Sequence, residues 1–414
     1  MFRNHHPTSS SSLPVLERLP APLRVLLLSS LACTPSDPDE GPDTAAGDTT
    51  TASSTTADPT TGADESSEST TTGGGGVTTG GNTDDGETGA DDTSTGDTGE
   101  LPVCPLPDQF SWTSSGPLAE PSSPPGHDFR SLKDFTVVRW EDQYIVYATA
   151  FDASSSWTGV HMTFDDWPDM ATAPQTWLGP LTLGATVAPQ LMYFEPDDVW
   201  VLSYQWGFKY ATSTEPNDPD SWTTPSPLLI GDPTQGSGGT GPIDQTIICD
   251  DTDCYIFFAG DNGHIYRGSM PIGDFPGAFS NTESIMSEGQ FDLFEGVEVY
   301  AVRGSDQYLM IVEAIGGGGR YFRAFTSNDL GGDFTAMPMA SSEATPFAGG
   351  NNVTFMGNEW TDDISHGDLV RVDPSQRKEI DTCNLQFLYQ GRDPSVNGDY
   401  GLLPYRPGVL TLTN

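Results

Sequence analysis

Three carboxylates and one imidazole stand where this sequence passes from turn residues into apolar runs. Asp244 directly precedes the run that ends at Ile248, and Asp134 and Glu295 hold similar places before other runs. His366 takes the comparable position in a further segment. Aspartate is a poor strand former, and an acid in front of a buried run needs a physical reason. A single case would indicate a polar strand end facing water, but the recurrence favours a shared site.

The chemistry open to such a site follows from the mutual repulsion of carboxylates. When three of them converge, at least one is expected to have a raised pKa and to hold a proton near neutral pH. A protonated acid facing an ionised base is the arrangement that glycoside hydrolysis requires, because one group protonates the leaving oxygen while the other activates water. The third carboxylate can tune the acid and orient a sugar.

Other site chemistries find less support. The sequence has no spaced Asp-x-Asp-x-Asp-Gly run of the calcium-loop kind, and its six His residues show no paired zinc-ligand spacing. The glycines at 316–319 lie between expected strands rather than before a helix, which argues against a phosphate loop. Residues 101–414 carry 42 acidic and 13 basic side chains, a surface that would repel nucleic acid.

The elements that must position these groups are hairpins. Two apolar, β-branched or aromatic runs flank a short turn in each of five units, and no amphipathic helix of useful length is evident. Such units predict an all-β, five-bladed β-propeller. Because the first strand of each blade lies nearest the axis, residues near its start converge there. The second unit offers Ala188 and Gln190 instead of an acid, which leaves room for a ligand. The units span residues 133–148, 187–204, 241–267, 294–312 and 364–389.

The cysteines predict two bridges. Cys249 and Cys254 end a four-residue loop between strands, where facing residues come close enough to be joined. If Cys33 is consumed elsewhere, Cys104 is left to pair with Cys383, which would tie the start of the folded region to its last part. The alternative is that one or both of these are free buried thiols. Disulfides of this kind indicate an oxidising compartment.

The chain before the folded region divides into two segments. Residues 1–33 predict an export signal, and the Ser-Leu-Ala-Cys that ends at Cys33 predicts a lipoprotein cleavage site with a lipid on that cysteine. Plain secretion with cleavage nearby is the alternative. Residues 34–103 are Thr, Ser, Gly and acids with almost no apolar side chain, so they predict a disordered acidic linker. Residues 104–414, which hold all nine Trp and all thirteen Tyr, form the predicted propeller.

Several motifs give the region a family resemblance. In order and with few gaps from Cys104 to Asn414, it is similar to glycoside hydrolase family 62, the arabinoxylan α-L-arabinofuranosidases. The segments that carry the resemblance are LKDFT at 132–136, GPIDQT at 241–246, AGDNGHIYR at 259–267, IVEAIG at 311–316, DISHGD at 363–368 and YQGRDP at 389–394.

The resemblance implies a monomeric propeller without an organic cofactor that removes arabinofuranosyl branches from arabinoxylan with inversion. It implies that Asp134 is the general base, Glu295 the general acid, and Asp244 the carboxylate that modulates the pKa of the acid. One departure is Gly401, where relatives commonly carry Asn, which puts the subsite preference in doubt. The remaining implied roles are an arabinose pocket for Lys133, xylan contacts for Trp206 and Tyr400, and calcium binding for His366.

Two alternatives to this activity stay open. Related five-bladed propellers with the same acidic trio cleave arabinan or xylosides, and a catalytically silent propeller would only bind polysaccharide at the cell surface.

Overall fold

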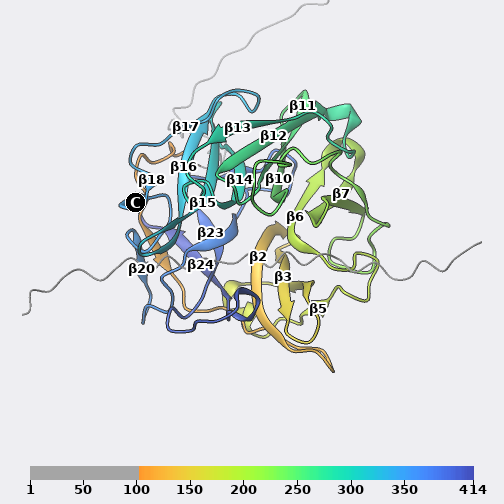
Figure 1. The fold of residues 1–414 in the computed structure, drawn as a ribbon, viewed down its shortest axis with the longest axis vertical. Helices are drawn as coiled ribbons and strands as arrows, with labels where there is room; N and C mark the ends of the chain where they lie inside the picture. The colour runs from red at the N-terminus through yellow and green to blue at the C-terminus, as the bar shows by residue number, and fades with distance from the viewer. Residues whose placement is uncertain (1–101) are drawn as a thin grey trace, which may run out of the picture. The chain divides into compact units, whose positions relative to one another are not determined.

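The computed structural model describes residues 102–414, which fold into five β-sheets around one axis (Figure 1). The predicted export signal, Cys33 and nearly all of the predicted linker lie outside the described residues. Blade 1 contains β2 (Phe129–Trp140), β3 (Gln143–Asp152), β4 (Trp157–Phe164) and β5 (Thr176–Trp177). Blade 2 contains β6 (Val187–Phe194), β7 (Val199–Gln205), β8 (Lys209–Ser213) and β9 (Ser226–Pro227). Blade 3 contains β10 (Ile243–Cys249), β11 (Asp253–Ala259), β12 (His264–Pro271) and β13 (Thr282–Ser287).

The last two blades recruit strands from distant parts of the chain. Blade 4 contains β14 (Glu295–Val302), β15 (Tyr308–Gly316), β16 (Gly319–Ser327) and β17 (Thr335–Ala336), with β22 (Glu379–Ile380) parallel to β14. Blade 5 has the order β21 (Ser365–Leu369), β23 (Gln386–Gly391), β24 (Arg406–Leu412), β1 (Trp112–Ser114) and β20 (Val353–Phe355). A small separate hairpin pairs β18 (Ser341–Ser342) with β19 (Thr345–Pro346).

The core of the propeller lies between the blades. The inner strands β2, β6, β10, β14 and β21 contact one another in a closed ring around the axis. Each of five apolar clusters fills the interface between two successive blades. Between blades 1 and 2, for example, Val138 and Tyr147 pack with Leu191 and Leu202. Burial of both faces of each sheet explains the long apolar runs in the inner strands.

The ring closes by joining the two ends of the described region. β1 pairs antiparallel with β24, the last strand, so the first strand completes the fifth blade. The predicted bridge between Cys104 and Cys383 is present, with a Cα–Cα distance of 5.1 Å. It ties the residues before β1 to the connection between β22 and β23. Closure of this kind pairs the strand edges that an open sheet would expose.

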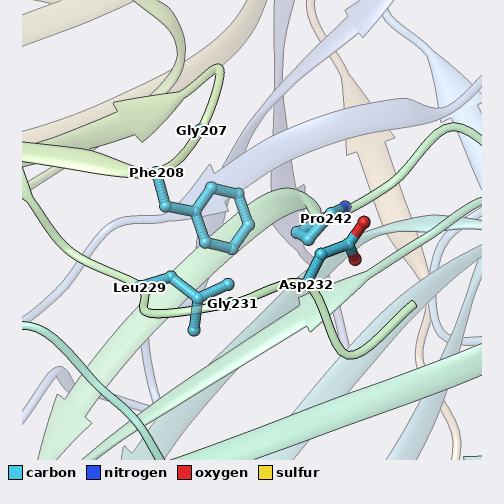
Figure 2. A pocket seen from close by; sticks show the side chains of 6 residues that line it. All are labelled: Gly207, Phe208, Leu229, Gly231, Asp232 and Pro242. Carbon is cyan, nitrogen blue, oxygen red and sulfur yellow. The ribbon is translucent and has the colours of Figure 1, made fainter. Parts of the chain in front are cut away.

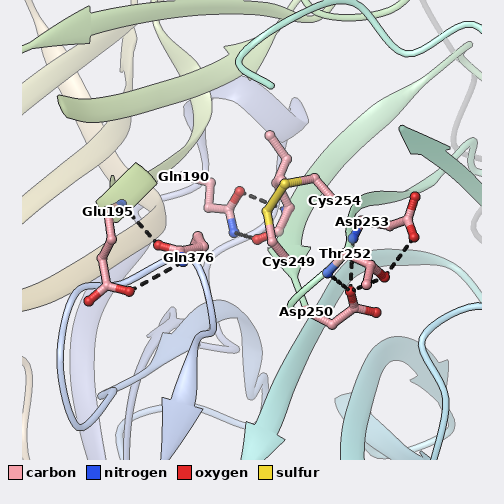
Figure 3. Close-up of a disulfide and its surroundings, with 9 residues drawn as sticks. Gln190, Glu195, Cys249, Asp250, Thr252, Asp253, Cys254 and Gln376 are labelled. Atoms are coloured by element: carbon pink, nitrogen blue, oxygen red, sulfur yellow. Dashed lines mark hydrogen bonds between the residues drawn. A yellow bond between two sulfur atoms is a disulfide. The ribbon is translucent and has the colours of Figure 1, made fainter. Parts of the chain in front are cut away.

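The predicted bridge between Cys249 and Cys254 is also present and joins the last paired residues of the β10–β11 hairpin (Figure 3). The two Cα atoms are 4.0 Å apart. In the turn between them, Asp250 Oδ1 accepts the backbone N–H groups of Thr252 and Asp253 at 2.7 and 2.8 Å. The Cys249 N–H donates to the carbonyl oxygen of Gln376 at 2.9 Å, which fastens the hairpin to the segment before β22.

Helical structure within residues 102–414 is confined to short 3-10 segments. They are η1 (Trp167–Ala171), η2 (Glu195–Asp197), η3 (Ile272–Asp274) and η4 (Tyr400–Leu402). None of the helices in this part of the chain has the length and apolar character to cross a membrane. The all-β, five-bladed architecture predicted from the hairpin pattern is confirmed.

Candidate active site

A bulge at the same place in every inner strand shapes the centre of the propeller. The register between first and second strands shifts at this point in all five blades. In four of them the shift contains a residue with positive φ: Asp134 at 49°, Ala188 at 43°, Asp244 at 54° and Gly296 at 60°. A bulge re-aims side chains and leaves backbone groups unpaired, and Asp tolerates the left-handed conformation better than most residues. The bulge therefore turns both aspartates toward the axis.

Asp244 and Glu295 stand at the start of their strands as expected, but Asp134 does not. β2 begins at Phe129, so Asp134 lies inside the strand, at the bulge, and not at the strand start as expected. Strand pairing continues on both sides of the bulge, from Phe129 with Asp152 to Trp140 with Gln143. Glu295 stands one position before the bulge residue Gly296. Its counterpart in blade 1 is therefore Lys133, and the counterpart of Gly296 is Asp134.

The N–H group freed at a bulge is taken up by the preceding blade. In four of the five blades, a polar side chain on the second strand of that preceding blade accepts it. These four bonds run from Asp134 to Gln390 at 2.7 Å, from Ala188 to Thr149 at 2.8 Å, from Asp244 to Gln205 at 2.7 Å and from His366 to Glu313 at 2.7 Å.

The fifth N–H group is the exception, and it holds Asp244 in place. The residue that would accept from Gly296 is Ala259, whose side chain has no polar atom. The Gly296 N–H donates instead to Asp244 Oδ2 at 2.9 Å. Asp244 is thus fixed through its own N–H group and through its carboxylate, and only 6% of it is exposed.

His366 lies between the two aspartates. Its Nδ1 atom is 3.4 Å from Asp244 Oδ2 and 3.6 Å from Asp134 Oδ1. Burial alone would lower the pKa of His366, but the carboxylate of Asp244, followed by that of Asp134, outweighs it and raises this pKa to about 10. The imidazolium offsets part of the charge of the two aspartates. The pKa of Asp244 is lowered, because His366 and the Gly296 N–H outweigh the effect of its burial.

Glu295 occupies a different electrostatic environment. Arg320 Nη1 contacts both Glu295 Oε1 and Glu313 Oε1. Glu313, which is fully buried, also accepts from Ser365 Oγ at 3.0 Å. Burial, helped by the nearby carboxylates, outweighs the opposing effect of Arg320 and raises the pKa of Glu295 well above its usual range. These surroundings therefore favour the protonated form of Glu295.

Lys133 points into an aromatic box. Its Nζ atom hydrogen-bonds Tyr400 Oη and lies 3.9 Å from the centroid of that ring. It lies 5.0 Å from the ring centroids of both Trp157 and Tyr405. Burial lowers the pKa of Lys133, while Asp134 and Glu295 act against that shift. Lys133 and Tyr400, predicted separately as substrate contacts, form one unit beside the carboxylates.

Trp206 stands apart from this group, with 50% of its surface exposed. Trp206 is the next residue after Gln205, whose side chain accepts the Asp244 N–H. It is therefore linked to the site through the backbone and not by direct contact. A cavity of about 220 Å³ lies next to it, lined by Phe208, Leu229, Asp232 and neighbouring residues (Figure 2). This cavity contains none of the central carboxylates.

At Gly401, a Cβ atom would lie 2.6 Å from the ring of Phe151, so that ring fills the space of a side chain.

A second polar layer closes the axis one step further along the inner strands. Two buried ion pairs neutralise it: Lys378 Nζ contacts Glu298 Oε2, and Arg371 Nη2 lies 3.2 Å from Asp368 Oδ2. Both cations come from the connection between β21 and β22. Charges buried so deeply need such partners. This second polar layer consists of five residues that hydrogen-bond to one another or to adjacent side chains: Thr136, Gln190, Thr246, Glu298 and Asp368.

Sequence reasoning missed several members of the site. Gln205, Glu313 and Gln390 are polar residues within apolar second strands, a feature that the sequence shows but that had no role attached to it. Glu313 and Gln390 lie inside segments that carried the family resemblance. Asp261, in the turn between β11 and β12, also lies inside such a segment, AGDNGHIYR at 259–267. Arg320 gave no local signal, because its role depends on residues from other strands.

The fold and the site together define a class: a five-bladed propeller with buried carboxyl groups in contrasting environments at its axis, as in glycoside hydrolases. The model of glycosyl hydrolase family 62 matches residues 111–411. The chain belongs to this family. It is 38% identical over 314 residues to α-L-arabinofuranosidase C of Cellvibrio japonicus, a match that covers 75% of this chain and 48% of that relative. The chain thus spans about half the length of this curated relative.

Solved structures show the same relationship. The catalytic domain of a Coprinopsis cinerea GH62 α-L-arabinofuranosidase is 39% identical, with a TM-score of 0.72. The similarity covers 75% of this chain and 99% of that one. An α-L-arabinofuranosidase of Podospora anserina, solved with cellotriose, is 35% identical with a TM-score of 0.70 and covers 75% of this chain and 98% of its own.

Proposed function

We propose that this chain is an α-L-arabinofuranosidase that releases single arabinofuranosyl side groups from arabinoxylan by an inverting mechanism. The observation that carries the proposal is the contrast between Glu295, whose pKa is raised, and Asp134, which lies beside the His366 imidazolium on the same axis. Inverting hydrolysis needs a protonated acid and a base that activates water. The names of the relatives support the sugar specificity.

In the proposed reaction each group has one task. Glu295 protonates the glycosidic oxygen as the bond to arabinose breaks, and Asp134 accepts a proton from the water that attacks the anomeric carbon. Asp244, fixed by Gly296 and Gln205, orients the sugar and adds negative charge near the acid. The Lys133–Tyr400 unit would contact arabinose or the adjoining xylan backbone, and exposed Trp206 would contact the backbone further out.

Product analysis by NMR tests this function directly. Incubation with wheat arabinoxylan is expected to release arabinose whose first-formed anomer is inverted relative to the substrate. Debranched arabinan and nitrophenyl xyloside, assayed in parallel, address the alternative substrates of related propellers. Faster release from either of these would overturn the substrate assignment, and no release from any of the three would favour a polysaccharide-binding propeller.

A calcium ion at His366 stays a prediction. Ca²⁺ prefers six to eight oxygen ligands. Asp134 and Asp244 supply carboxylate oxygens next to the imidazole, but no group of three or more His, Cys, Asp or Glu residues in the described part of the chain is arranged to hold a metal. An ion here would need His366 in its neutral form and would take most of its ligands from water. Treatment with EDTA is then expected to lower the melting temperature, and added calcium to restore it; an unchanged melting temperature would contradict the prediction.

Export also stays a proposal. The two disulfides support an oxidising compartment. Mass spectrometry of the mature N-terminus distinguishes a lipid on Cys33 from plain secretion.

A further inference from the structure

A fourth carboxylate, Asp261, lies beside the general acid of the proposed reaction. It occupies the turn between β11 and β12, with a φ of 54°. β11 returns to the axial end of blade 3, where its last residue, Ala259, pairs with Ile243 next to Asp244. The Asp261 carboxyl reaches from this turn toward blade 4 and contacts the carboxyl of Glu295.

The surroundings of Asp261 fix its position. Thr240 Oγ1 donates to Asp261 Oδ2 at 2.9 Å, and Gln290 Nε2 donates to the Asp261 carbonyl oxygen at 2.8 Å. The Thr240 N–H also donates to the carbonyl oxygen of Gly260 at 3.1 Å. Two neighbouring loops therefore hold this turn. The carboxyl cannot easily swing away from Glu295.

The second oxygen of Asp261 has no donor. Asp261 Oδ1 is buried and finds no hydrogen-bond partner among residues 102–414. Buried carboxylate oxygens are normally satisfied, and an oxygen left without a donor next to another carboxyl group is satisfied when one of the two carries a proton. Pairs of this kind titrate together and keep one proton between them.

Asp261 is expected to raise the pKa of Glu295 more than Asp244 does, because the two aspartates have different charged neighbours. The charge of Asp244 is offset by the adjacent His366, whereas Asp261 forms no ion pair among residues 102–414. Burial raises the pKa of Asp261 to about 6, so it is ionised at neutral pH and repels a second negative charge on Glu295. The charged and titratable groups that face Glu295 are Arg320, Glu313, Asp261, Asp244, Lys133 and Tyr400.

We propose that Asp261 is a positioning residue that shares a proton with Glu295 and keeps this acid protonated for the leaving oxygen. The inference rests on the proposed function, because it presumes that Glu295 donates the proton. It assigns to Asp261 a large part of the role that the family resemblance gave to Asp244.

The test is the pH dependence of kcat/KM, measured for Asp261→Asn and Asp261→Gly on an arabinoxylan oligosaccharide. Both substitutions suit the left-handed backbone, so the turn is retained. Loss of the negative charge is expected to move the high-pH limb to lower pH by about one unit and to reduce activity at neutral pH about tenfold. An aryl arabinofuranoside with a leaving group that needs no proton is expected to show no such shift. Asp306→Asn, at an exposed turn, is the matched control.

The outcomes separate the two proposals. If both variants keep the wild-type pH profile while Glu295→Gln is inactive on the oligosaccharide, the role of Asp261 is wrong and the proposed function stands. If Glu295→Gln retains full activity on the oligosaccharide, the assignment of the acid fails, and the inference about Asp261 fails with it.

Discussion

Glu295→Gln is expected to fold normally and to release arabinose from arabinoxylan about 10²- to 10⁴-fold more slowly than the wild type, the usual contribution of a general acid. Glutamine has the size of glutamate but no proton to give to the glycosidic oxygen. Its amide oxygen can still accept the hydrogen bond from Arg320, as the protonated carboxyl group does. Initial rates on arabinoxylan measure the loss, and the far-ultraviolet circular dichroism spectrum checks the fold.

The leaving group provides the decisive control for this variant. A substrate whose leaving group departs without protonation, such as a dinitrophenyl arabinofuranoside, is expected to react at nearly the wild-type rate with Glu295→Gln. Equal losses on both substrates would show that Glu295 does something other than donate a proton.

The pH profile of the wild type follows from the same residue. Because Glu295 acts in its protonated form, activity is retained below its raised pKa and falls as the pH rises through it.

Asp134→Asn is expected to reduce activity at least as strongly, and on every substrate. Asparagine cannot accept a proton from water, and in an inverting enzyme that water is needed whatever the leaving group is. The substitution preserves the local structure, since Asn also tolerates the left-handed backbone of the bulge and keeps the N–H bond to Gln390. The measurement is the rate on arabinoxylan and on the dinitrophenyl substrate, with Asp306→Asn as the control.

Comparing the two variants separates acid from base. Only the Glu295 variant is expected to recover with the better leaving group. Full activity of Asp134→Asn on either substrate would show that another group activates the water, and the assignment of the base would have to be abandoned.

Much of the architecture was predictable from local patterns. Alternating apolar runs around short turns reveal a hairpin without reference to any other part of the chain, so five blades could be counted. The Cys249–Cys254 bridge follows from the same hairpin, and the Cys104–Cys383 bridge from the number of cysteines. The repeated position of the acids was enough to place Asp134, Asp244 and Glu295 near one axis.

The structure alone decided how these groups are held and charged. The sequence could not show that β1 completes blade 5, because its partner β24 lies at the other end of the domain. Nor could it show that Arg320 bridges Glu295 and Glu313, or that Asp261 reaches Glu295 from the preceding blade. Strand periodicity reports which residues are buried together in one hairpin. Protonation depends on burial and on charges brought from distant strands, and only the closed ring of blades brings those together.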